Sequence, residues 1–306
     1  MTSEPTLEER IARLETARHN ESRGSASVWL QRLTVLAVIA LVTLNVALVV
    51  QQRSLSAEQS LQQAFWDLSH SGLGPAARAN AFLKLTASRN TEWRSANLES
   101  LSLPAVDLTG ADLSSARFMS CDFSRGLFAE ANLEKAGIDL CDLTDAVFSK
   151  AKLRNATLFK STLHGADFRN ADLMSASLEQ TKAHGATFVA ARMGDSFLAM
   201  ADLSQSDFTG ADLTGANLEA AILKETDLAL TNLFETRLLD TDFTDSNWWR
   251  SRGLTSQQLD ELTLKFPPSA RAPESRQRDF EIWFTKRLSD SRPAEKAEPE
   301  KSSEQQ

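Results

Sequence analysis

Apolar and polar residues recur with a period of five between positions 96 and 250. Position 98 and every fifth position to 248 hold Leu, Phe, Ile, Met or Trp at 30 of 31 places, and Ala183 is the exception. Two residues earlier, Ala, Ser, Thr, Cys or Gly fills 29 of 31 places, with Leu101 and Val106 as exceptions. Since no insertion breaks the register, residues 96–250 form one uninterrupted repeat, which takes precedence over local patterns.

A period of five excludes a helix, because apolar residues at that spacing drift around a helical surface. Residues two apart in an extended chain point the same way, so the small and large residues share one face and the residue between them points outward. The remaining two residues must turn the chain. Each unit is therefore a short strand plus a corner that must stack on neighbouring units.

Four units complete one turn, because several features repeat every 20 residues. The inward phenylalanines Phe128, Phe148, Phe168, Phe188 and Phe208 have this spacing, as do the pairs Cys121 and Cys141, and His164 and His184. Residues 20 apart then lie at about the 4.8 Å separation of neighbouring strands. The pattern predicts an all-β square solenoid of nearly eight coils.

Units such as Ala111-Asp112-Leu113-Ser114-Ser115 carry the motif A(D/N)LXX, and Asp or Asn fills 16 of the 31 middle positions. This pattern resembles the pentapeptide-repeat family over about half of the chain. The resemblance implies a right-handed quadrilateral β-helix, a hand that the spacing alone does not fix.

An apolar run within residues 28–50 predicts a transmembrane helix. From Leu33 to Val50 no residue is charged, and Trp29 and Arg32 suit a membrane interface. The alternatives are a buried core helix, which is rarely apolar all round, and a signal peptide, whose apolar run begins sooner.

The flanking arginines predict the orientation of this helix. Residues 13–32 hold four arginines, whereas residues 51–70 hold only Arg53. The positive-inside rule then places the N-terminus in the cytoplasm and the solenoid outside it, at the cell (inner) membrane.

The remaining segments flank these two features. Leu7, Ile11 and Leu14 predict a short amphipathic helix that either forms a coiled coil, and so a homo-oligomer, or is simply solvated. After Pro75, a helix over residues 76–88 should cap the first coil, and Thr255 should be the N-cap of a helix over 256–264. The expected divisions are a polar N-terminal segment at 1–27, the membrane helix at 28–50, a helical linker and cap at 51–95, the β-helix at 96–250, a helical segment at 251–289, and a disordered tail at 290–306.

Composition and motifs argue against catalysis and against direct nucleic-acid binding. The 306 residues carry a net charge of −8, whereas a nucleic-acid binder needs basic surface. No phosphate-binding glycine loop, CxxC, HExxH or GxSxG occurs. We therefore expect no enzyme, cofactor or metal site.

Three sets of outward or reactive residues allow two interpretations each. The middle aspartates either solvate the surface and bond to local backbone or form a site, and outward rows favour the first. His164 and His184 have no third ligand and read as surface residues. Cys121 and Cys141 fill small core positions, although their spacing permits a disulfide in an oxidising compartment.

An exposed apolar cluster is the strongest candidate binding site. Six residues at outward or corner positions project from one side of the square, and such clusters often mark a partner site. Packing at the corners is the alternative. The candidate surface comprises Met119, Leu140, Phe159, Phe197, Met200 and Leu239.

Two functions follow from these features. The first is a membrane-tethered interaction or scaffold protein with an unknown protein partner, since repeat solenoids present extended binding surfaces. The second rests on the family resemblance, because some soluble members imitate DNA and bind gyrase. Residues 195–245 hold eleven acids and two bases, which suits such mimicry if the solenoid is cytoplasmic.

Overall fold

The computed structural model describes residues 7–69, 74–87 and 93–290 of the chain. The expectations for residues 1–6, for the break at 70–73 and for a disordered tail at 291–306 lie outside these ranges. The chain divides between Gln63 and Ala64 into two compact units, and each is considered by itself.

Helix α1 runs from Leu7 to Ser69 as one helix of 63 residues. The sequence analysis predicts separate segments here, and that division is wrong at the level of secondary structure. The reason is that no proline interrupts this stretch, and its one glycine, Gly24, costs only about 1 kcal/mol in a helix. The membrane segment is therefore part of a longer continuous helix.

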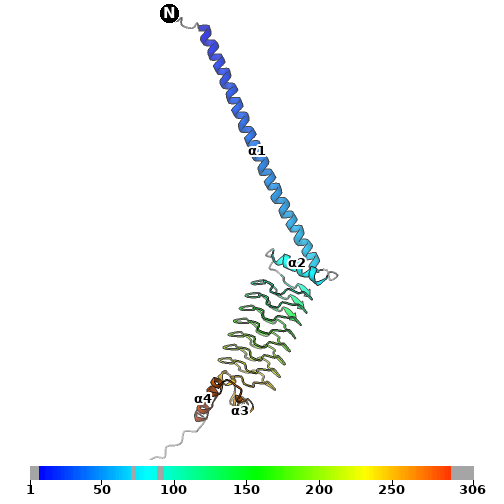
Figure 1. Ribbon diagram of the computed structural model, residues 1–306, viewed down its shortest axis with the longest axis vertical. Coiled ribbons are helices and arrows are strands. Elements are labelled where there is room, and N and C mark those ends of the chain that lie inside the picture. Colours follow the sequence, from blue (N-terminus) through cyan, green and yellow to red (C-terminus); the bar gives the residue numbers. More distant parts are fainter. Residues whose placement is uncertain (1–6, 70–73, 88–92, 291–306) are drawn as a thin grey trace, which may run out of the picture. The chain divides into compact units, whose positions relative to one another are not determined.

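Helix α2, Pro75–Ala87, covers the first coil of the solenoid, as expected (Figure 1). Phe82 and Leu85 are fully buried, and the Phe82 ring lies 4.4 Å from that of Trp93. The Arg78 guanidinium donates to the Glu99 carbonyl at 3.1 Å. This helix shields the apolar end that a solenoid otherwise exposes.

The solenoid consists of stacked parallel coils (Figure 1). Strands β1 (Asn97–Glu99), β2 (Arg117–Met119) and β3 (Gly137–Asp139) pair in the order β1-β2-β3 with a shift of 20 residues. Single-residue bridges continue the same shift from Ser102↔Asp122 to Asn232↔Arg252. A coil therefore has four sides, as the 20-residue spacing predicts.

The four sides are numbered by the residues that open them. The first face begins with residues 97–99, the second with 102–104, the third with 107–109 and the fourth with 112–114, and each continues at every twentieth residue. All six residues of the candidate partner surface lie on the first face or at the corner that follows it.

Each corner is a turn whose third residue has a left-handed conformation. In the turn Leu108-Thr109-Gly110-Ala111, the Ala111 N–H donates to the Leu108 carbonyl at 3.0 Å, and Gly110 has φ +67°. This is the geometry of a type II turn. Most corners place a residue other than glycine there, such as Ser115 (φ +58°), so the stacked neighbours must hold the strained backbone.

Every backbone donor of a regular unit is satisfied. In Ala211–Gly215, Ala211 closes the preceding turn, Asp212 donates to the coil before, and Leu213 and Gly215 donate to the coil after, at 2.8–3.0 Å. The fifth donor, Thr214 N–H, is bound at 3.2 Å by the Asp212 carboxylate. The outward Asp thus replaces the one backbone partner that the stacking geometry lacks.

The interior is filled by the two inward positions of each unit. Five phenylalanine rings stack along one line, with centroids 4.7–5.0 Å apart and planes within 12° of parallel. The 20-residue spacing of Phe128 to Phe208 predicts this ladder. Ala183, the exception in the large position, is also fully buried.

Three short helices close the other end. The 3₁₀ helix η1, Trp248–Arg250, is followed by α3, Ser256–Lys265, and α4, Glu274–Asp290. Thr255 is the N-cap of α3 and forms a capping box with Gln258, which confirms the predicted cap.

Candidate interaction surfaces

The first face carries apolar side chains in contact with solvent. Met119, Leu140, Phe197 and Met200 are about half exposed, and Leu239 is 63% exposed. Because the stacking of coils fixes each corner, these side chains stand on a rigid support. The geometry places them where a protein partner could reach them.

Phe159 differs from the other five residues of the candidate surface. It is half-buried, and the Lys160 ammonium lies 5.0 Å from its ring centroid. A cation over an aromatic ring is a favourable contact. The expectation that Phe159 is a freely presented side chain is therefore only partly met.

Acidic residues divide the first face. At the position after the large inward residue, acids and apolar residues alternate from coil to coil: Glu99, Met119, Asp139, Phe159, Glu179, Ala199, Glu219 and Leu239. Leu140 adjoins Phe159 through a backbone hydrogen bond of 2.9 Å. The apolar surface thus forms two groups, Met119-Leu140-Phe159 and Phe197-Met200, with Leu239 farther along.

Sequence reasoning missed several exposed apolar residues. Leu127, Ile222, Leu230 and Phe234 project from the other three faces, and Leu264 of α3 is 84% exposed. The first four occupy outward or corner positions of the repeat, so the same rule could have found them. Exposed apolar side chains are therefore concentrated on the first face without being confined to it.

The outward aspartates bind nearby backbone, as predicted. The Asp107 carboxylate accepts the Thr109 N–H at 3.0 Å, and this hydrogen bond lowers the pKa of Asp107. Hydrogen bonds from the Arg169 side chain lower the pKa of Asp167 in the same way. These carboxylates are turn-forming groups, and their ionised form is the one that the turns favour.

Cys121 and Cys141 lie in the core as free thiols on adjacent coils. The Cys121 N–H lies 3.4 Å from the Cys141 sulfur. The neighbouring Cys121 sulfur and the burial raise the pKa of Cys141, so it is an unreactive thiol at neutral pH. A disulfide between them stays a prediction for an oxidising compartment.

His164 and His184 stack on the second face with ring centroids 6.2 Å apart and planes at 76°. Among the residues that the structure describes, no group of three or more His, Cys, Asp or Glu side chains is placed to hold a metal ion.

An aromatic cluster joins α4 to the end of the solenoid. The rings of Trp248 and Trp249 contact that of Phe280 at 6.1 and 5.0 Å. The Asp279 carboxylate accepts from the Trp249 indole at 2.8 Å and forms an ion pair with Arg250. Hydrogen bonds from the Arg250 side chain lower the pKa of Asp279.

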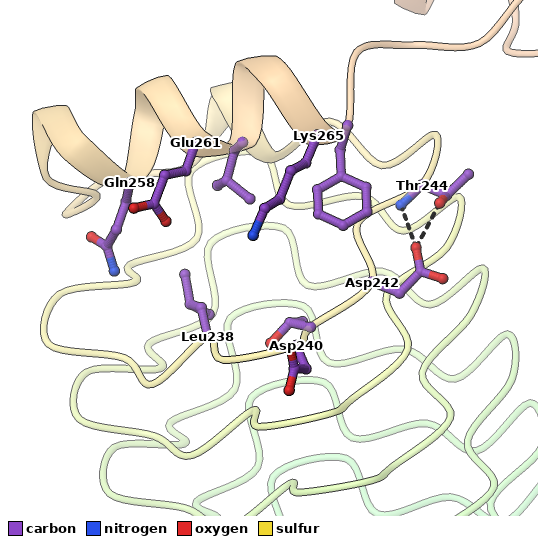
Figure 2. Close-up of a pocket in the computed structure, with 10 residues that line it drawn as sticks. Leu238, Asp240, Asp242, Thr244, Gln258, Glu261 and Lys265 are labelled. Carbon is purple, nitrogen blue, oxygen red and sulfur yellow. Dashed lines mark hydrogen bonds between the residues drawn. The ribbon is translucent and has the colours of Figure 1, made fainter.

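A pocket of about 390 Å³ lies between α3 and the last coil (Figure 2). Asp240 and Asp242 project from the coil, while Glu261 and Lys265 project toward them from α3. The Asp242 carboxylate is held by Thr244 and lies 3.2 Å from the Lys224 ammonium. Its other lining residues are Leu238, Thr241, Gln258, Leu262 and Phe266.

The chain has a single candidate membrane span among the residues that the structure describes. By length and composition alone, Val38–Ala64 of α1 is apolar enough to cross a bilayer, with mean hydropathy 1.5 and none of its apolar window buried. Thr43 and Asn45 interrupt the apolar sequence, and both side chains donate to carbonyls of the same helix at 2.9 and 3.0 Å.

Comparison with known proteins identifies the repeat. A family model described as "Pentapeptide repeats" matches in 8 copies over residues 94–125 and 127–247, which is half of the chain. Proteins with this repeat fold as right-handed β-helices, in agreement with the parallel 20-residue register. No curated protein matches the chain.

Solved structures of similar proteins include three with different titles. HetL, involved in heterocyst differentiation regulation in Nostoc sp. strain PCC 7120, is 24% identical, with 57% of this chain and 98% of that chain covered and a TM-score of 0.38. QnrB1, a plasmid-mediated fluoroquinolone resistance protein, is 22% identical over 56% and 91%, with a TM-score of 0.42. A pentapeptide repeat protein of the Arabidopsis thaliana thylakoid lumen is 20% identical over 60% and 88%, with a TM-score of 0.15.

Proposed function

Because this chain belongs to the pentapeptide repeat family, whose members are generally non-enzymatic structural or interaction proteins, we propose that it is a non-enzymatic interaction scaffold. A rigid rod of nearly eight coils presents its first face to a protein partner. A membrane-crossing part of α1 tethers this rod to the cell (inner) membrane, with the solenoid outside the cytoplasm.

The observation that carries this proposal is the exposed apolar side chains of the first face. Phe197 and Met200 are 47% and 56% exposed, although the solenoid has an interior in which such side chains could be buried. Exposed apolar groups on a rigid support favour binding, because little conformational entropy is lost when a partner docks.

The tether is supported by the chemistry of α1. The apolar part exposes its side chains over the whole described window, which is costly in water and favourable in lipid. Its polar groups at Thr43 and Asn45 are satisfied within the helix, as a bilayer requires. Arg13, Arg18, Arg23 and Arg32 before the span, against Arg53 after it, favour a cytoplasmic N-terminus.

Reporter fusions at the C-terminus test the tether and its orientation. A reporter active only outside the cytoplasm should be active, and one active only inside should be silent. The opposite pair of results would reverse the orientation. Release of the protein from washed membranes by high salt or carbonate would refute a spanning helix.

Site-specific photo-crosslinking in cells tests the partner surface. A photoreactive amino acid at position 200 should capture a defined partner. The matched control is position 190, which occupies the same place in the turn on the third face and is also exposed. Equal capture from both positions would show that the first face is not selective.

A second candidate is a DNA-mimicking protein that binds gyrase, and it requires a cytoplasmic solenoid. The excess of eleven acids over two bases in residues 195–245 favours it. These acids occur on all four faces of the coils. Inhibition of purified gyrase by the protein, and its loss when Asp and Glu of this segment become Asn and Gln, would support this alternative.

A further inference from the structure

The backbone ladder of the solenoid ends at different coils on different faces. On the fourth face, Leu233 N–H donates to the Arg252 carbonyl at 2.8 Å, and on the third face Leu230 N–H donates to Arg250 at 3.0 Å. On the first and second faces no further strand follows residues 237–245, because the chain turns away into α3. The solenoid therefore has a half-open edge.

Three donors at this edge have no hydrogen-bond partner among residues 7–69, 74–87 and 93–290: the N–H groups of Leu238, Asp240 and Phe243. The equivalent groups one coil earlier all donate to the next coil. The N–H groups of Leu218, Ala220 and Leu223 bind the carbonyls of Arg237, Leu239 and Asp242 at 3.0, 2.9 and 2.7 Å, respectively. Unpaired edge donors are a template for pairing with another extended chain.

The pocket shown in Figure 2 lies at this edge. Leu238 and Asp240 line it from the last coil, and α3 spans above it with Gln258, Glu261 and Lys265. A helix bonds its own backbone groups internally, so α3 covers the edge without supplying carbonyl acceptors to it. The volume of about 390 Å³ is within the range of ordinary ligand sites.

The charges around the pocket favour a basic occupant. Of its three carboxylates, only that of Asp242 lies in an ion pair, with Lys224. Asp240 and Glu261 have no ion-pair partner among the residues that the structure describes, and Lys265 is the one cation lining the pocket. An incoming Lys or Arg would compensate the two remaining negative charges.

We propose that this edge binds a short extended segment of a partner protein that carries Lys or Arg. The segment adds one rung to the first and second faces: its carbonyls accept from Leu238, Asp240 and Phe243, and its basic side chains contact Asp240 and Glu261. Backbone bonds supply affinity and the side chains supply selectivity, as in other cases of strand addition. The inference rests on the proposed role as an interaction protein and names the chemistry of one partner, but it requires neither the membrane tether nor the first-face apolar residues.

The test uses the full chain in detergent and fluorescein-labelled hexapeptides in which Lys or Arg alternates with Thr or Val. Fluorescence anisotropy should show saturable binding, which is abolished when Glu replaces the basic residues. The double variant Asp240→Asn, Glu261→Gln should weaken binding about tenfold, whereas Lys265→Gln should strengthen it about threefold. Asn is well tolerated at position 240, where φ is +55°.

Asp195→Asn is the matched control for the charge variants. Asp195 also occupies a left-handed corner (φ +55°), but on the fourth face and away from the pocket, so its replacement should leave peptide affinity unchanged. Thermal unfolding of all variants should match that of the unmodified chain. A loss of affinity as large for Asp195→Asn as for the double variant would reduce the effect to overall charge.

Hydrogen exchange distinguishes strand addition from other binding. The peptide should slow amide exchange in residues 236–245 and leave residues 216–225, one coil earlier, unchanged. Failure of every basic hexapeptide to bind, or binding without this protection, overturns the proposal. Protection that rises with protein concentration without peptide would identify a second copy of the chain as the occupant and would also overturn it. The topology reporters and the crosslinks at position 200 report separately on the scaffold proposal.

Discussion

The phenylalanine ladder allows its stacking energy to be measured apart from its apolar burial. Phe168 is fully buried, and its ring stacks on those of Phe148 and Phe188 at 4.8 and 5.0 Å. Phe208, at the end of the ladder, is equally buried but stacks only on Phe188, at 4.7 Å. Leu already fills most large inward positions, so Phe→Leu removes ring contacts while keeping an apolar side chain there.

The two substitutions should therefore differ by one ring pair. With about 1 kcal/mol for each aromatic pair, Phe168→Leu should lower the free energy of unfolding by about 2 kcal/mol and Phe208→Leu by about 1 kcal/mol. Phe168→Ala, which also leaves a cavity, should cost about 4 kcal/mol. Both Leu variants lose similar apolar volume, so that loss largely cancels in the comparison.

Urea denaturation followed by circular dichroism, with the full chain in detergent, measures these differences. A double-mutant cycle of Phe148→Leu and Phe168→Leu should give a coupling of about 1 kcal/mol. Equal losses for Phe168→Leu and Phe208→Leu, together with zero coupling, would show that the rings are only apolar filling. The reasoning about the ladder would then be refuted.

Three further predictions concern the core, the surface and the C-terminal cap. Ala166→Phe should lower the free energy of unfolding by about 3 kcal/mol, because a fully buried small position has no room for a ring; unchanged urea unfolding would mean that the inward face is wrongly assigned. Phe197→Ser should change stability by less than about 1 kcal/mol because the side chain is half exposed, while reducing recovery of a crosslinked partner; a protein that no longer folds would make Phe197 structural. Asp279 has a lowered pKa in the folded state, so its ion pair with Arg250 stabilises the cap above the ordinary Asp pKa of about 3.9 and is lost as pH falls through the folded value. Asp279→Asn should therefore reduce the melting temperature at pH 7 but not at pH 2, and a difference that persists at pH 2 would remove the charge as its cause.

The solenoid is predictable from the sequence because its constraints are local and repeated. The inward and outward positions follow from the period of five, and the spacing of the phenylalanines fixes the number of units in a coil. The left-handed corners are less visible. Few of them hold glycine, and positions such as Leu140 (φ +59°) or Lys150 (φ +58°) give no sign of a strained turn when read alone. The stacking of coils imposes that conformation, and no local preference announces it.

The surface and the ends could be predicted less well, because they depend on single contacts. The position of Lys160 over Phe159 depends on how one long side chain lies, which the period of five does not determine. The continuity of α1 across the expected boundaries reflects the absence of a strong helix breaker, a weaker signal than the change in hydropathy. The unpaired donors at Leu238, Asp240 and Phe243 become visible only when each backbone bond has been assigned.

The fixed length of the coil has a consequence for how such a chain can change. Each unit turns the backbone through one quarter of a revolution, so the face on which a residue lies depends only on its distance in sequence from the first unit. Loss or duplication of one unit, for example Ala151–Asn155, would preserve the inward pattern and rotate everything after it by a right angle. Phe197 and Met200 would then leave the side shared with Met119 and Leu140, although no contacting residue had been altered. In this molecule the arrangement of a binding surface is set by counting, and an exact deletion of five residues is a cleaner way to separate its two halves than any substitution.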